Sequence, residues 1–442
     1  MRALGLTAFV ALTTVTAIFW SLHGGPSWYG VAVFGLLAVK LVLSWRAPVA
    51  VARREVDRER LDALRVGVAI PMYNEDPDII EQCLRSLLAQ TRRPQSVIVV
   101  DGCSGDGRAA EVVERWIPVF AEGGIPLVLE RFPENRGKRE GLIACLDLQP
   151  DADVMLCVDS DTVLDPRALE EALVPLLDDR VQVVTGLVLA LNFRTNILTR
   201  LIDLRYANAF LFERAAYSAL GSVLCACGSL SIYRTALMKK YRDDFLTQTF
   251  LGRPAVFGDD RRLTNYGLLE GRVLFQQTAI AYTAVPERWS HYLRQQIRWN
   301  KSFFRESIWA LTHLPMHRWA FWLTFTEVAT WSVFSVVVVY ALFVAPALTG
   351  TLLLGPYILY IALIGYARSV RYLDLTGIRQ TRKDRLIGFA LAPLYGVVHI
   401  GLLMWLRVYA LCTLRSGGWG TRKTVEVQFN ADNTGLPQGG QA

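Results

Sequence analysis

Two aspartates separated by one residue follow an apolar run near the middle of the chain, in the segment DVMLCVDSDT. The run Val154–Val158 predicts a buried strand, and Asp159 and Asp161 then emerge on the same side of the chain. Two carboxylates at this spacing could hold a divalent cation through oxygen ligands and leave positions for a diphosphate. An acidic turn with a helix-capping residue has the same sequence pattern. The spacing alone leaves both interpretations open.

Three further polar segments contain residues that could take part in the same chemistry. In DGCSGDG, Asp101 could accept hydrogen bonds from a base or ribose, although Gly and Asp are also typical of a plain turn. In NRGKREG, Lys138 could neutralise phosphates, although such cations are usually solvated. In GDDRRLTN, Asp260 could act as a general base, although negative charge at a helix start is stabilising in itself.

Short β-branched runs predict the elements that position these residues. Helix-like stretches such as PDIIEQCLRSLLAQ separate the runs, which predicts an α/β domain with a mostly parallel sheet covered on both faces. In such sheets ligands bind at the carboxyl ends of the strands, so we expect the polar clusters to converge on one crevice. The predicted strands lie in Arg65–Asp76, Ser96–Gly107, Ile125–Phe132, Asp153–Thr162 and Val181–Leu191.

The composition predicts that this domain is attached to a membrane. Of the 442 residues 52% are hydrophobic, and the mean hydropathy of +0.28 exceeds that of most soluble enzymes. Four apolar runs approach the length of a bilayer span, and we interpret the first as part of an uncleaved hairpin instead of a signal peptide. Lys40 and Glu327 lie in two of the runs, where they could line a channel or reach the interface. The runs are Leu4–Trp20, Tyr29–Trp45, Trp319–Leu348 and Leu352–Tyr366.

The distribution of Lys and Arg predicts the orientation. Basic segments follow the second and fourth runs, whereas the links SLHGGPS and PALTG carry no Lys or Arg. The positive-inside rule therefore places the central domain and both termini in the cytoplasm of a multi-pass plasma-membrane protein. This arrangement accounts for much of the net charge of +7, and we expect no nucleic-acid partner.

Two segments have an amphipathic or mixed character. Ser302–Leu314 predicts an interfacial helix with Lys301, Arg305 and Glu306 on its polar side. Leu386–Leu411 is apolar enough to span, but we favour an interfacial or re-entrant helix because a crossing would place the basic tail outside. The predicted organisation is a membrane hairpin (1–45), a cytoplasmic domain (46–300), an interfacial helix (301–318), a membrane helix pair (319–368), a loop with an interfacial or re-entrant helix (369–416) and a cytoplasmic tail (417–442).

The order of these motifs resembles a known family. Asp101, Lys138, the D-x-D pair and GDD are followed by Gln295-x-x-Arg298-Trp299, a series similar to that of the processive, inverting glycosyltransferases with the GT-A fold, which include cellulose, chitin and hyaluronan synthases. GDDRRLTN, RQQIRWNKSFFRE and GWGTRK are most similar to hyaluronan synthases, and next to the Nod-factor chitooligosaccharide synthases. The family usually has proline where Ser229 stands, a local departure in an acceptor-site loop.

The resemblance implies a role for each matching residue. Asp159 and Asp161 would hold Mg²⁺ or Mn²⁺, and Asp260 would be the general base. Trp299 would offer its face to the acceptor sugar at a channel mouth. The remaining matching residues would contact the nucleotide: Tyr73 and Asp101 at the uridine, Lys138, Gln295 and Arg298 at the diphosphate, and Trp419 and Arg422 in a closing tail.

The resemblance also implies a product. The expected substrates are UDP-N-acetylglucosamine and UDP-glucuronate, polymerised into hyaluronan that crosses the plasma membrane, with the growing polysaccharide and membrane lipids as partners. The main alternative is a chitin or chitooligosaccharide synthase that uses UDP-N-acetylglucosamine only. A nucleotide-sugar sensor would not need the base Asp260, and a non-processive lipid-modifying transferase would not need Trp299 at a channel mouth.

Overall fold

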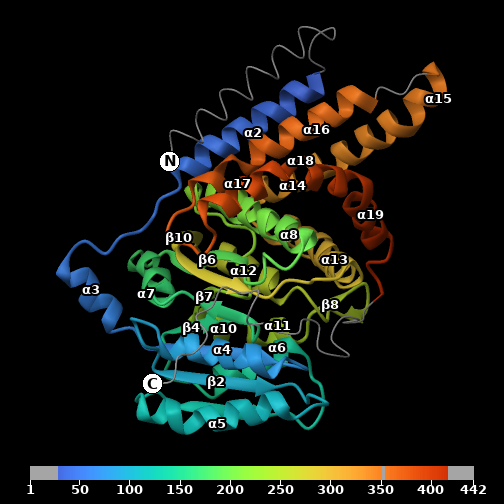
Figure 1. The fold of residues 1–442 in the computed structure, drawn as a ribbon. Helices are drawn as coiled ribbons and strands as arrows, with labels where there is room; N and C mark the ends of the chain where they lie inside the picture. Colours follow the sequence, from blue (N-terminus) through green and yellow to red (C-terminus); the bar gives the residue numbers. More distant parts are fainter. Residues whose placement is uncertain (1–27, 351–353, 417–442) are drawn as a thin grey trace.

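The computed structural model describes residues 28–350 and 354–416. In this part of the chain eight strands form one mixed sheet in the order β3-β2-β1-β4-β7-β6-β10-β5 (Figure 1). Strands β1 to β4 run parallel, as do β6 and β10, whereas β7 and β5 are antiparallel to their neighbours. The bounds are β1 Val66–Met72, β2 Ser96–Asp101, β3 Leu127–Arg131, β4 Val154–Cys157, β5 Thr162–Leu164, β6 Val181–Ala190, β7 Ser231–Arg234 and β10 Arg272–Thr283. The mostly parallel sheet is thus confirmed.

All five strands predicted from the sequence are present, as β1, β2, β3, β4 and β6. In β1, β2, β4 and β6 the apolar side chains are buried because helices cover the sheet, which is why these strands appear as continuous hydrophobic runs. Strand β3 is at the sheet edge, and its Val128 is 40% exposed. The helices of this domain are α3 Glu55–Asp62, α4 Pro77–Leu88, α5 Arg108–Glu122, α6 Lys138–Asp147, α7 Ala168–Leu173, α8 Ile197–Ala207, α9 Ala215–Ala219, α10 Thr235–Lys240, α11 Arg242–Leu246 and α12 Asp259–Glu270, with a π-helical turn η2 at Asn208–Arg214 and a small hairpin β8 Thr249–Phe250 and β9 Arg253–Pro254.

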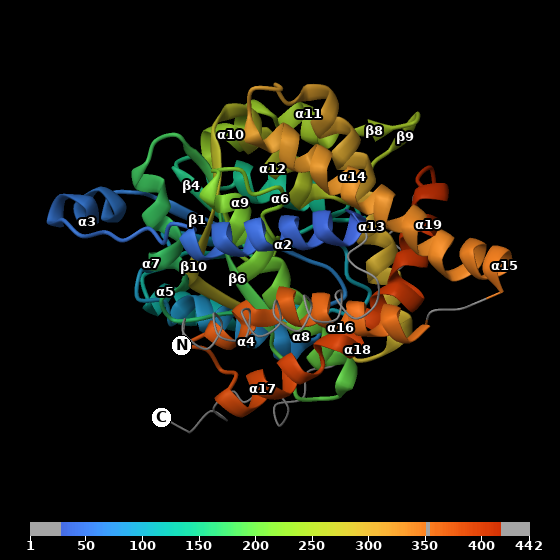
Figure 2. The ribbon, with the colours of Figure 1, turned by 90° about the horizontal axis from the view of Figure 1, so that it is seen from above.

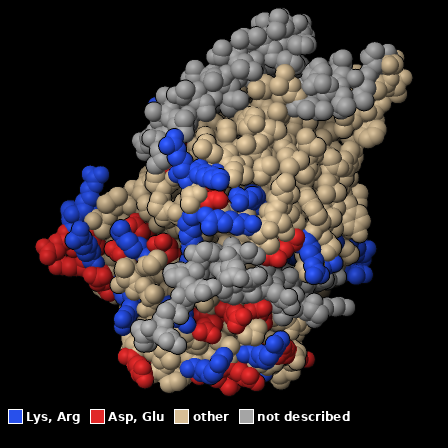
Figure 3. All heavy atoms as spheres, viewed as in Figure 1, with Lys and Arg blue, Asp and Glu red and all other residues tan. Residues whose placement is uncertain are grey.

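Apolar helices lie together beyond one edge of this domain (Figures 1 and 2). They are α2 Trp28–Arg46, α14 Trp319–Val339, α15 Ala345–Thr349, α16 Leu354–Ser369, α18 Ala392–Val398 and α19 Met404–Cys412. Among the described residues, Trp319–Leu348 and Ala392–Cys412 are long and apolar enough to cross a membrane. In Figure 3 charged side chains gather over the α/β domain and its junction with the helices, whereas the described surface of the upper helices in this view is largely uncharged. The predicted run Leu4–Trp20 lies outside the described residues.

Helix α13 (Trp289–His313) corrects one prediction. The expected boundary at residue 300 falls inside this continuous helix. Lys301, Arg305 and Glu306, expected on a solvent-facing side, are buried. Glu306 and Arg305 contact α12 and the segment before it. Glu306 and Arg305 therefore face the α/β domain, whereas Lys301 donates to Ser416 after α19.

The segment Leu386–Leu411 is divided in the structure. Helix α17 (Arg382–Ala390) begins at a Thr381 capping box and ends before Leu391, and a second helical stretch then starts at Ala392. This second stretch packs closely on α16, since a Cβ at Gly396 would lie 2.6 Å from Cγ2 of Ile361. The division separates a short polar helix from an apolar one.

Candidate active site

A cavity of about 860 Å³ lies between the ends of the sheet strands and the apolar helices. At its polar end it is lined by residues that follow strands or begin helices of the α/β domain. Eight of the residues predicted for the site line it together: Tyr73, Lys138, Asp159, Asp161, Asp260, Gln295, Arg298 and Trp299. The expectation that polar clusters at strand ends converge on one crevice is therefore confirmed for Tyr73 after β1 and for Asp159 and Asp161 after β4.

The carboxylates of Asp159 and Asp161 enter the cavity just after β4. Asp159 Oδ2 accepts a hydrogen bond from Ser229 Oγ at 3.0 Å, so the residue that replaces the usual proline contacts the acidic pair directly. Asp161 Oδ1 accepts from Thr283 Oγ1 at 3.0 Å, at the end of β10. Each carboxylate is thus oriented by a hydroxyl from a different element.

Lys138 connects the two acidic motifs. Its Nζ lies 2.5 Å from Asp159 Oδ1 and 3.4 Å from Asp259 Oδ2, so one ammonium bridges the end of β4 and the start of α12. Burial disfavours the ammonium, but the charges of Asp159 and Asp259 outweigh burial and raise the pKa of Lys138. Gly137, with φ of 85°, precedes it and lets the chain turn into α6. Lys138 is therefore a permanent cation in this site.

Asp260 lies in the first turn of α12 and is held by its own neighbours. Oδ1 accepts from the backbone N–H of Arg261 at 2.8 Å, and Oδ2 lies 3.6 Å from the Cys225 Sγ donor. Burial and the adjacent charge of Asp259 raise the pKa of Asp260, with Lys138 and Arg261 acting in the opposite direction. A carboxylate with a raised pKa is a stronger base, as general-base catalysis requires.

Helix α13 brings the Q-x-x-R-W residues to the cavity. The ring of Trp299 lies 6.2 Å from that of Tyr206, and the Arg205 guanidinium lies 5.2 Å from the Trp299 ring centre. Gln295 Oε1 is buried and has no hydrogen-bond partner among the described residues. A buried acceptor that borders a cavity is well placed to meet a ligand.

Asp101 differs from the other predicted site residues. It is fully buried, and its Oδ1 accepts from Ser104 Oγ at 2.6 Å. Its neighbours Val100 and Gly102 line the cavity, whereas Asp101 is not among the lining residues. Trp419 and Arg422 lie outside the described residues.

Several lining residues were not predicted from the sequence. Asp259 and Arg261 belong to the quoted motif GDDRRLTN, so their position beside Asp260 was a usable signal. Thr283 ends β10, a strand that was not predicted. Arg205 and Arg214 belong to no motif and reach the cavity from α8 and η2.

The acidic pair fits a hard divalent cation. Asp159 and Asp161 supply carboxylate oxygens at one cavity wall, the ligand type that Mg²⁺ and Mn²⁺ prefer. Within residues 28–350 and 354–416 there is no cluster of three or more His, Cys, Asp and Glu side chains that could hold a metal. The protein would therefore share the ion with a ligand and water, as is usual for Mg²⁺ bound with a diphosphate.

The mostly parallel sheet, with Asp159 and Asp161 after β4 and Lys138 beside them, has the architecture of a GT-A glycosyltransferase, and a family model described as "Glycosyltransferase like family 2" matches residues 64–302. Hyaluronan synthase of Streptococcus pyogenes is 37% identical over 410 residues, covering 90% of this chain and 91% of the relative. The chain belongs to the hyaluronan synthase family of glycosyltransferases.

Other relatives show how far the similarity extends. An N-acetylglucosaminyltransferase of Rhizobium sp. (strain N33) is 37% identical and covers 83% of this chain and 79% of its own. Among solved structures, the mannosyltransferase PcManGT of Pyrobaculum calidifontis is 21% identical, with a TM-score of 0.49 over 85% of this chain and 98% of its own. The sequence relatives thus extend beyond the 64–302 domain into the helices.

Proposed function

We propose that this protein polymerises UDP-N-acetylglucosamine and UDP-glucuronate into hyaluronan and passes the chain across the plasma membrane. The observation that carries the proposal is the continuity of the cavity. The same cavity that contains Asp159 and Asp260 is also lined by Leu36 and Lys40 of α2 and Trp331 of α14. A sugar transferred at the carboxylates can therefore move into the helical region without first entering bulk solvent.

The charges of the cavity support an anionic product over a neutral one. In the lining that comes from α2, α8, η2, α13, α14, α16 and α19, cations outnumber acids. A positively charged cavity wall attracts a polymer that carries a carboxylate on alternate sugars. It gives no such attraction for neutral chitin. The cations are Lys40, Arg205, Arg214, Arg298, Arg368 and Arg407, and the acids are Glu213 and Glu327.

The proposed reaction is a single displacement. Asp260 takes the proton from the acceptor hydroxyl as its oxygen attacks the anomeric carbon. The bond from that carbon to the diphosphate breaks on the opposite face, so an α-linked donor becomes a β-glycoside and UDP leaves. Trp299 presents its ring to the acceptor sugar, which keeps the reacting hydroxyl near the start of α12.

Cationic and hydrogen-bonding groups would hold the nucleotide. Lys138 and Arg298 neutralise charge on the departing UDP, a preorganised electrostatic role, and Tyr73 contacts the uridine. The buried Asp101 would act from behind the cavity wall, by holding Ser104. Mg²⁺ or Mn²⁺ held by Asp159 and Asp161 would polarise the phosphate oxygens. In the predicted mechanism the tail residues Trp419 and Arg422 close over the nucleotide.

A two-donor assay tests the product. We incubate the purified protein with UDP-N-acetylglucosamine alone, UDP-glucuronate alone and both, in Mg²⁺ or Mn²⁺, and size the products. Long polymer is expected only with both donors, because the two sugars alternate along the chain. Hyaluronidase should digest this polymer. Polymer or oligomers formed from UDP-N-acetylglucosamine alone, with glucuronate ignored, would assign the protein to the chitooligosaccharide type.

We further propose that both termini and the α/β domain are cytoplasmic. In this arrangement the segment α17 to α19 does not cross the bilayer, so the C-terminal tail stays in the cytoplasm. The basic segments beside the predicted spans support this orientation.

The orientation is tested by cysteine labelling. A cysteine at Gln438 should resist a membrane-impermeant thiol reagent in intact cells and react after permeabilisation. Ser27→Cys in the predicted outer link should be labelled in intact cells, with the parent protein as background. Labelling of the Gln438→Cys protein in intact cells would instead mean that Ala392–Cys412 crosses the bilayer.

A further inference from the structure

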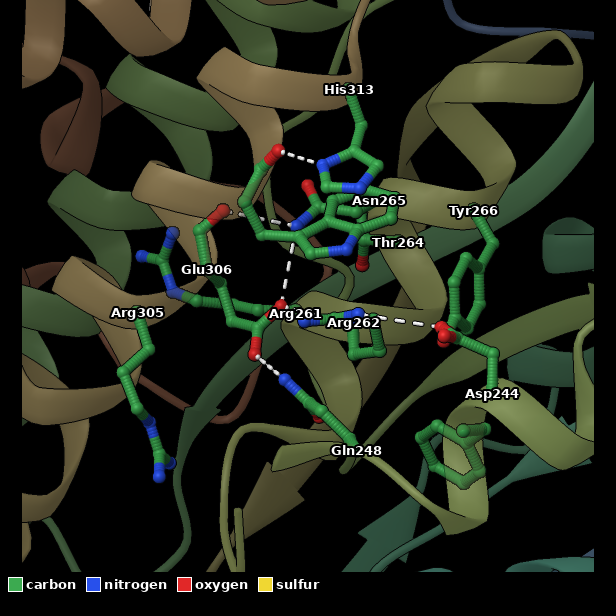
Figure 4. A network of polar contacts seen from close by, with 12 residues as sticks. Asp244, Gln248, Arg261, Arg262, Thr264, Asn265, Tyr266, Arg305, Glu306 and His313 are labelled. Carbon is green, nitrogen blue, oxygen red and sulfur yellow. Dashed lines mark hydrogen bonds and ion pairs between the residues drawn. The ribbon is translucent and has the colours of Figure 1, made fainter. Parts of the chain in front are cut away.

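Glu306 is a buried carboxylate on α13 that lies outside the cavity and has no role in the reaction described above. Only 1% of its side chain is exposed. Its Oε2 accepts from Arg262 Nε at 2.8 Å, and its Oε1 accepts from Gln248 Nε2 at 2.6 Å (Figure 4). Asn265 Nδ2 donates to the Glu306 backbone oxygen at 3.3 Å. One side chain therefore connects α13 with α12 and with the segment that precedes α12.

The partners of Glu306 are themselves held in place. Arg262 is 5% exposed, lies 3.4 Å from Asp244 Oδ2, and stacks over the Trp309 ring with its guanidinium 4.4 Å from the ring centre. Tyr266 also donates to Asp244. The Arg262 guanidinium therefore has one orientation, fixed by groups on α11, α12 and α13. A buried charge pair of this kind is directional, because each member needs its hydrogen bonds to offset the loss of water.

The two helices that Glu306 joins carry different halves of the site. Helix α12 carries Asp260 in its first turn, two residues before Arg262, and α13 carries Arg298 and Trp299, two turns before Glu306. At this crossing Gly258 adopts φ of 93°, and a Cβ there would lie 2.5 Å from Ser302 Oγ. The base and the acceptor-binding ring are therefore positioned relative to each other by this short contact.

We propose that Glu306 is a positioning residue that sets the register of α12 on α13, so that Asp260 meets the acceptor hydroxyl held at Trp299. This inference rests on the proposed function. Most of the donor-binding groups lie on other elements, since Asp159 follows β4 and Lys138 begins α6, whereas Arg298 lies two turns before Glu306 on α13. Loss of the Glu306 contacts should therefore impair acceptor attack more than donor binding.

The proposal predicts uncoupled turnover. When the acceptor hydroxyl is misplaced, water can attack the anomeric carbon instead, the carbon–diphosphate bond breaks, and UDP and free sugar are released. In Glu306→Gln, which keeps the shape but removes the charge, sugar incorporation should fall by about 10- to 10²-fold. UDP release should fall less, so that the ratio of UDP released to sugar incorporated rises above that of the wild type. The KM for each donor and metal-dependent UDP binding should stay close to wild type.

The matched control is Glu270→Gln, at the other end of α12. Glu270 pairs with Lys240 at 2.7 Å at the protein surface and has no contact with Glu306 among the described residues. Its loss should leave the ratio of UDP released to sugar incorporated unchanged. If Glu306→Gln does not fold, the same ratio is measured in Arg262→Lys, which keeps both charges but loses the planar donor geometry. The double variant Arg262→Met/Glu306→Met should fold, since apolar replacement of a buried pair is often tolerated, yet remain uncoupled.

The outcomes separate this inference from the proposed function. A ratio equal to that of the wild type in a folded Glu306→Gln or Arg262→Lys protein overturns the positioning role. A proportional loss of UDP release and incorporation also overturns it, because this is the result of reduced stability alone. If the wild type makes no polymer from the two donors, the proposed function fails instead.

Discussion

Replacement of Asp260 by Asn is expected to reduce sugar transfer by about 10²- to 10⁴-fold, the range that a general base contributes. Asn keeps the size of the side chain and an oxygen that can accept from the Arg261 N–H, but it cannot take the acceptor proton. UDP binding should be retained, because Tyr73, Lys138 and the acidic pair lie on other elements. The measurement is polymer formation by the purified variant beside isothermal titration with UDP.

A control on the same domain distinguishes chemistry from folding. Asp147→Asn removes an ion pair with Arg242 at 2.6 Å on the surface, and it should retain wild-type transfer. Both proteins should show similar thermal unfolding. Polymerisation by Asp260→Asn at close to the wild-type rate would show that another group is the base.

The second large effect is expected for Asp161→Ala. Removal of this carboxylate should abolish the Mg²⁺- or Mn²⁺-dependent part of UDP binding and lower transfer by about 10²-fold or more. A bound metal contributes several kcal/mol of charge stabilisation, and about 1.4 kcal/mol corresponds to a factor of ten in rate. The measurement is UDP affinity with the metal and with a chelator, in the wild type and in the variant.

The control for this change is Asp151→Ala, whose side chain is 87% exposed and lies 3.9 Å from Arg65. It should bind UDP with the metal dependence of the wild type. Chelator should weaken UDP binding to the wild type and to Asp151→Ala, and leave Asp161→Ala unaffected. An unchanged affinity of the wild type for UDP with and without chelator would remove the metal role of the acidic pair.

The parts of the fold that could be predicted have local signals. The strands β1, β2, β4 and β6 are short apolar runs because they are covered by helices, and this burial leaves a pattern in the sequence itself. The edge strand β3 is mostly exposed, but it still contains the short apolar run LVL at 127–129. Strand β10 was missed because Gln276 and Gln277 interrupt its apolar run, and its pairing with β6 shifts register between Gln276 and Ile280. Strand β7 has four residues, like β4, but its sequence SIYR has polar residues at both ends and lacks the continuous apolar run VMLC of β4.

The site shows the same division. The rule that ligands bind at the carboxyl ends of strands was enough to expect Asp159 and Asp161 in the site. Asp260 and the Q-x-x-R-W residues were expected beside them through the resemblance to the family. Arg205 and Arg214 had no such signal, since an arginine on a helix is usually solvated. Their position in the cavity depends on how α8 and η2 cross the sheet.

The sequence by itself determined the class of fold, the apolar runs and the motif residues of the site, because hydrophobic periodicity and motif spacing are properties of neighbouring residues. Only the tertiary structure decided that Lys138 bridges Asp159 and Asp259, and that Glu306 faces inward instead of toward solvent. The polar side of α13 has the pattern of an exposed face, and it is buried because Arg262, 44 positions away, supplies the opposite charge. Burial of a charge depends on a partner that is distant in sequence, so the local pattern cannot reveal it.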